Sequence, residues 1–107
     1  MTDADGSHQL RLGFETTVIY WRGPSPFFYA PVPPEPAAAI RRVSRGVSYG
    51  WGCIPVTASV GGVDFRTSLF PKDGTYLVPL KAAVRRRTSI TAGDVVRMGM
   101  TIDLDAR

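Results

Sequence analysis

The chain has 107 residues and a formal net charge of +4, enough for one domain with one hydrophobic core but too short for two. Apolar residues make up 44% and charged residues 21%, as in ordinary globular proteins, and no apolar run approaches the roughly 20 residues of a membrane span. The first residues are acidic and polar, unlike a secretory signal, so we expect a cytoplasmic protein without membrane contact. A single cysteine excludes an internal disulfide.

The N-terminal third predicts a tail, two strands and a helix. Residues 1–9 are polar and are expected to be flexible, and a single domain is expected over residues 10–105. Residues 10–22 alternate between apolar and polar side chains, which indicates a long strand, and residues 27–32 form a short aromatic strand. Two prolines then end the strand, and proline and glutamate precede an alanine-rich segment that predicts a helix over residues 35–46.

The middle of the chain predicts a β-hairpin. Residues 50–60 and 63–69 both alternate with a period of two, and Gly61-Gly62 between them is typical of a two-residue turn in which both residues have positive φ. In the first of these strands the residues expected to face the core are Ile54, Val56, Ala58 and Val60.

The C-terminal third predicts a strand, a short basic helix and a last strand. The strand at residues 75–79 should end at Pro79, which has no N–H group for a ladder, and the helix should begin near Leu80. A turn at residues 92–94 leads into the strand at residues 94–104. Six strands and two short helices predict a mainly β fold: a small six-stranded barrel, closed or partly open.

Two stretches of this region resemble known families. The run VPLKAAVRRRTSITAGDVV is similar to the half-barrel motif of AbrB-like double-split β-barrels. The longer run from YGWGCIPVTASVGG through FRTSLFPKDGTYLVPL resembles DUF1905, a bacterial family of unknown function, over roughly Phe14 to Asp103. The resemblance implies a small β-barrel and no established reaction. Family members also occur joined to another domain, which implies an accessory role.

Residues that could carry out catalysis are sparse. No phosphate-binding loop, zinc-protease motif or nucleophile elbow is present, and the only histidine, His8, lies in the polar tail. Cys53 has no base beside it in sequence, and a buried inert thiol is the simpler interpretation. The sequence therefore favours a binding protein over an enzyme and predicts no catalytic residue, metal ligand or cofactor.

Aromatic residues gather near strand ends and loops in greater number than six short strands need for packing, although core packing explains each of them singly. If some line the barrel mouth beside cationic and hydroxyl side chains, they form an apolar pocket that favours anions. We therefore predict binding of a small ligand, with an anionic group favoured. The predicted site residues are Trp21, Trp51, Arg66, Ser68, Phe70, Lys72, Tyr76 and Lys81.

Two alternatives stay open. Residues 35–87 hold nine lysines and arginines against three acidic residues, which indicates either a solvated helix face or a nucleic-acid surface whose affinity falls steeply with salt. The second alternative is a protein-interaction module that exposes the run FFYAPVPP. Oligomeric state is not predicted. The arginines of the nucleic-acid alternative are Arg41, Arg42, Arg45, Arg85, Arg86 and Arg87.

Overall fold

The structure is a computed structural model that describes residues 8–23, 27–48 and 52–105. It contains seven strands and two helices in those ranges. Their bounds are β1 Gln9–Thr17, β2 Ile19–Trp21, β3 Phe27–Pro31, α1 Pro34–Val47, β4 Ile54–Val60, β5 Val63–Lys72, β6 Thr75–Pro79, α2 Ala82–Thr88 and β7 Val95–Asp103.

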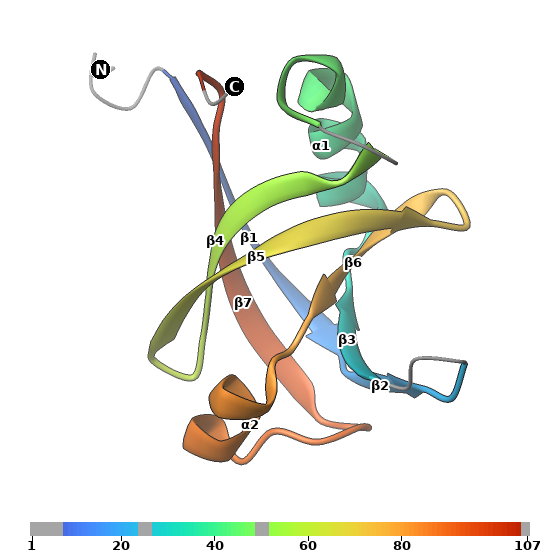
Figure 1. Cartoon of the computed structure of the whole chain (residues 1–107), viewed down its shortest axis with the longest axis vertical. Coiled ribbons are helices and arrows are strands. Elements are labelled where there is room, and N and C mark those ends of the chain that lie inside the picture. Colours follow the sequence, from blue (N-terminus) through green and yellow to red (C-terminus); the bar gives the residue numbers. More distant parts are fainter. Residues whose placement is uncertain (1–7, 24–26, 49–51, 106–107) are drawn as a thin grey trace.

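All seven strands belong to one antiparallel sheet that curls into a half-barrel (Figure 1). The strand order is β1-β7-β4-β5-β6-β3-β2, so the two strands at its ends are consecutive in the chain. The Thr16 hydroxyl of β1 donates a hydrogen bond to the Pro31 carbonyl of β3, and no ladder joins β1 to β3 among the described residues. The fold is mainly β as predicted, but the closed six-stranded barrel is wrong.

The difference in strand number comes from Val18. The N–H of Val18 donates to the Asp94 carbonyl at 2.9 Å, and its own carbonyl accepts from the Gly93 N–H at 2.8 Å. These bonds take Val18 out of both neighbouring ladders and bury its side chain. The predicted strand over residues 10–22 is therefore two strands, β1 against β7 and β2 against β3.

Elsewhere, the turn, the element ends and the inward strand face that the sequence predicts are found in the structure. Gly61 and Gly62 have φ of 56° and 80°, the positive values that a primed hairpin turn between β4 and β5 requires. Strand β6 ends at Pro79, and α1 starts at Pro34, just before the predicted residue. The inward residues of β4, Ile54, Val56, Ala58 and Val60, are all buried, as the alternation predicts.

Buried apolar side chains fill the inside of the curled sheet, with α1 at one end of the molecule and α2 at the other (Figure 1). The largest residues that are almost fully buried are Ile40, Ile54, Leu69, Leu80, Met98, Ile102, Val18 and Val78. The clefts described below lie on the outside of this core.

Within the described residues, neither helix has the length and apolar character that crossing a membrane requires.

Candidate functional site

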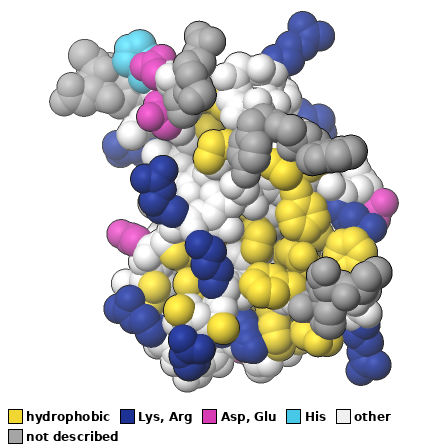
Figure 2. Space-filling model, viewed as in Figure 1, with side chains coloured by type: hydrophobic (Ala, Val, Ile, Leu, Met, Phe, Trp, Pro, Cys, Tyr) yellow, Lys and Arg dark blue, Asp and Glu magenta, His cyan; other side chains and the backbone are white. Residues whose placement is uncertain are grey.

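The structure brings three of the predicted site residues together. The Lys72 ammonium nitrogen lies 4.1 Å from the centre of the Trp21 ring. Tyr29 links this pair to Phe70, because its ring centre is 6.0 Å from that of Trp21 and 5.3 Å from that of Phe70. Figure 2 shows hydrophobic side chains gathered over β3 and β6, with lysine and arginine side chains around them.

The other predicted residues lie elsewhere. Tyr76 is buried in the core, and Trp51 lies outside the described residues. Arg66 and Ser68 are on the outer face of β5, where the Lys81 ammonium donates a hydrogen bond to the Arg66 carbonyl at 2.8 Å. The predicted single site is thus divided between an aromatic group and the outer face of the sheet.

The arginines of the nucleic-acid alternative are also separated. Those of α1 and those of α2 lie at opposite ends of the molecule, so they do not form one surface (Figure 1). Arg41 donates a hydrogen bond to the Gly74 carbonyl at 2.7 Å, whereas Arg85 lies against an aromatic ring. For the protein-interaction alternative, Tyr29 is buried and Phe27 and Phe28 are half-buried.

A cleft of about 230 Å³ lies between the β2–β3 hairpin and the start of α2. The Tyr20 and Phe28 rings are 4.7 Å apart, and the Arg85 guanidinium carbon is 3.5 Å from the centre of the Phe28 ring. We call this feature the aromatic cleft. The residues that line it are Tyr20, Phe27, Phe28, Leu80, Ala82 and Arg85.

The aromatic cleft forms where the ladder of β2 and β3 meets the segment that leads into α2. Tyr20 is directly opposite Phe28 in the ladder of β2 and β3, which places the two side chains on the same face. The Leu80 N–H donates to the Phe28 carbonyl at 2.9 Å, so the segment leading into α2 lies beside β3 and brings Arg85 over the ring. Tyr20 itself is 44% exposed, so its ring is accessible from solvent.

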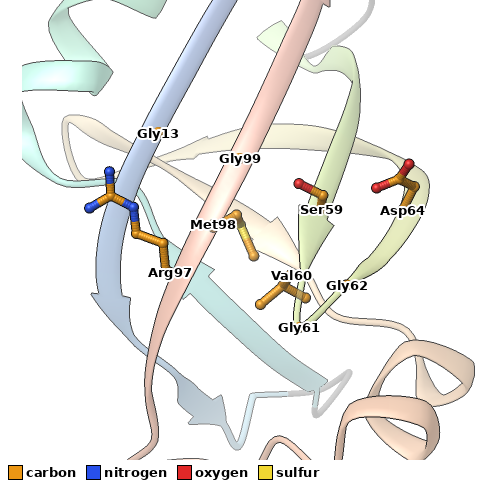
Figure 3. A pocket seen from close by; sticks show the side chains of 9 residues that line it. All are labelled: Gly13, Ser59, Val60, Gly61, Gly62, Asp64, Arg97, Met98 and Gly99. Carbon is orange, nitrogen blue, oxygen red and sulfur yellow. The ribbon is translucent and has the colours of Figure 1, made fainter.

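The outer face of β1, β7, β4 and β5 carries two shallow hollows of about 370 and 400 Å³. In the first, Arg97 and Asp64 stand on opposite sides, with Ser59 between them and glycines on the floor (Figure 3). The second hollow includes Arg66, from the predicted site, and Asp103. Among the described residues, no three histidine, cysteine, aspartate or glutamate side chains come together as a metal ion would need.

Comparison with known families identifies the chain. The mainly β fold and the clefts on its outside place the chain in the class of small β-domains. A family model described as "Domain of unknown function (DUF1905)" matches residues 14–100. The chain therefore belongs to the DUF1905 family, and the predicted resemblance is confirmed. No curated protein matches the sequence.

Proposed function

We propose that this domain binds a small ligand with a flat apolar body and an anionic group, and that the aromatic cleft holds it. The observation that carries the proposal is Arg85. Its guanidinium carbon lies 3.5 Å from the centre of the Phe28 ring, and the residue is half-buried. Within the described part of the chain, none of the guanidinium N–H groups has a hydrogen-bond acceptor. A guanidinium held by one face on a ring keeps its in-plane donors available for a carboxylate or phosphate.

The charge around the aromatic cleft supports an anion. Of the described residues that line it none is acidic, and the exposed Arg86 and Arg87 follow Arg85 on α2. Their positive potential attracts anions, and partial burial of Arg85 strengthens a charged hydrogen bond relative to one in bulk water.

The size of the aromatic cleft supports a small ligand. Its volume of about 230 Å³ is below the roughly 300–1,000 Å³ of sites that hold drug-sized molecules. The exposed Tyr20 ring offers a surface on which a planar group can stack. A single aromatic ring with one carboxylate or phosphate has the required size and chemistry.

The test is a titration of the full chain with benzoate and phenyl phosphate, with benzamide as the uncharged control, followed by chemical shifts and by thermal unfolding. We expect the two anions to bind at millimolar concentration and to raise the melting temperature, because a ligand that binds only the folded state stabilises it. Arg85→Gln should abolish the response, whereas Arg97→Gln, on the outer face of the sheet, should keep it.

Three results would contradict the proposal: no response to either anion, an equal response to benzamide, or equal losses in the two arginine variants. The melting temperature of each variant without ligand shows that it is folded, so a lost response reports the site alone.

A further inference from the structure

The two hollows lie next to each other on the outer face of the sheet, and we call them together the outer trough. Both are lined by residues of β4 and β7, and the two hollows lie in successive rows of the same ladders. The lining residues that carry polar side chains are Gln9, Thr57, Ser59, Asp64, Arg66, Arg97, Thr101 and Asp103.

Strand register explains why this face is hollow. Gly99 is opposite Gly13 on one side and opposite Ser59 on the other, and in the next row Thr57 is opposite Thr101. On the outer face, small side chains thus occupy these two rows of the neighbouring strands β4 and β7. A Cβ atom at Gly99 would lie 2.8 Å from the Ser59 hydroxyl oxygen, so the absence of a side chain at Gly99 makes room for that hydroxyl.

Long polar side chains stand beside this floor, and several have no partner in the protein. Among the described residues, the side chains of Asp64, Arg66 and Arg97 take part in no hydrogen bond or ion pair. Asp103 accepts a hydrogen bond from the Asp105 N–H at 3.0 Å and keeps acceptor capacity. The outer trough therefore offers guanidinium donors and carboxylate acceptors, together with hydroxyls that serve as either.

In the described part of the chain, the charges of the lining balance, with two arginines and two aspartates, and no lining side chain is aromatic. A nucleic acid is disfavoured because it needs a basic excess and usually stacking rings. A hydrophobic protein surface is disfavoured because interface cores are apolar and depleted of charge.

We propose that the outer trough binds a neutral oligosaccharide. Each sugar hydroxyl donates one hydrogen bond and accepts others, so adjacent hydroxyls can satisfy an aspartate and an arginine at the same time without adding charge. The Ser59 hydroxyl lies over Gly99, and the Arg97 guanidinium lies over Gly13. Both groups can donate a hydrogen bond to a sugar ring that rests above them. Two hollows in successive rows favour a chain of sugars over a single one.

The test is a screen of the full chain on an array of neutral, sulfated and phosphorylated glycans, followed by calorimetry with the best neutral oligosaccharide and with its monosaccharide. We expect binding to neutral glycans, tighter for the oligomer, with little change as salt is raised. Asp64→Ala and Arg66→Ala should each weaken binding about tenfold, the cost of one hydrogen bond to a charged group. Arg42→Ala, on the exposed face of α1, should leave the affinity unchanged.

The proposal is overturned if no neutral glycan binds, if acidic glycans bind best and salt releases them, or if Arg42→Ala weakens binding as much as Arg66→Ala. Unfolding curves identify any variant that is not folded, and Thr57→Val then serves as a second probe in the same trough. Arg85→Gln should not change glycan affinity, so this test and the test of the aromatic cleft fail independently.

Discussion

The aromatic cleft and the outer trough belong to the same sheet but use opposite chemistry. In the cleft, rings from β2 and β3 form the lining together with the half-buried Arg85, and Leu80 in the same lining belongs to the core. In the trough, small residues lie in the middle, and Asp64, Arg66 and Arg97 extend into solvent without a hydrogen-bond or ion-pair partner among the described residues. The comparison teaches that the fold provides the positions, whereas the side chains on each face decide what can be bound.

The largest difference between the two regions should be in stability. Leu80 is 1% exposed although it lines the aromatic cleft, so Leu80→Ala should lower the free energy of unfolding by about 2–5 kcal/mol. Thr57→Ala, on the exposed floor of the outer trough, should lower it by at most about 1 kcal/mol. Urea denaturation measures both, and similar losses would show that the cleft wall is not part of the core.

An intermediate effect is expected from the contact between Phe28 and Arg85. A double-mutant cycle with Phe28→Leu and Arg85→Gln should give a coupling of about 1 kcal/mol in the free energy of unfolding, typical of a partly desolvated cation–π pair. The same cycle with Arg86→Gln should show no coupling, since Arg86 is exposed on α2. Equal couplings in the two cycles would mean that Arg85 is not held on the ring.

The smallest effect is expected on the floor of the outer trough. Gly99→Ala should change the free energy of unfolding by under about 1 kcal/mol, because the Ser59 hydroxyl can rotate away from the new methyl group and the unfolded chain loses entropy. In a Ser59→Ala background the same substitution should be stabilising by about 0.5 kcal/mol. Urea denaturation that finds the same change in both backgrounds would contradict the contact between these residues.

Local signals made much of the fold predictable. The Gly61-Gly62 turn and the inward face of β4 depend on neighbours in sequence, and the structure confirms both. The division of the first strand was not predictable in this way, because Val18 bonds with Gly93 and Asp94, which are distant in sequence. Because this break cannot be seen in the sequence, the prediction has one long strand where the structure has two.

The sites were less predictable than the fold, for the same reason. Sequence composition identified the aromatic and cationic residues, but their grouping depends on the register of β2 with β3 and on where α2 lies. Arg85 belongs to a run of three arginines, and nothing in the run distinguishes the one that contacts Phe28. The glycines opposite each other at positions 13 and 99 become neighbours only through the pairing of β1 with β7.

That pairing of the first strand with the last has a practical consequence. The Leu104 N–H donates to the His8 carbonyl at 2.7 Å, so the two polypeptide ends of the described domain leave from one corner, far from α2 (Figure 1). A tag, a surface anchor or another protein can therefore be attached at either side of the domain without blocking the groove near Arg85. Relocating the ends by circular permutation, with a short linker between residues near 8 and 105, should likewise leave the sheet intact.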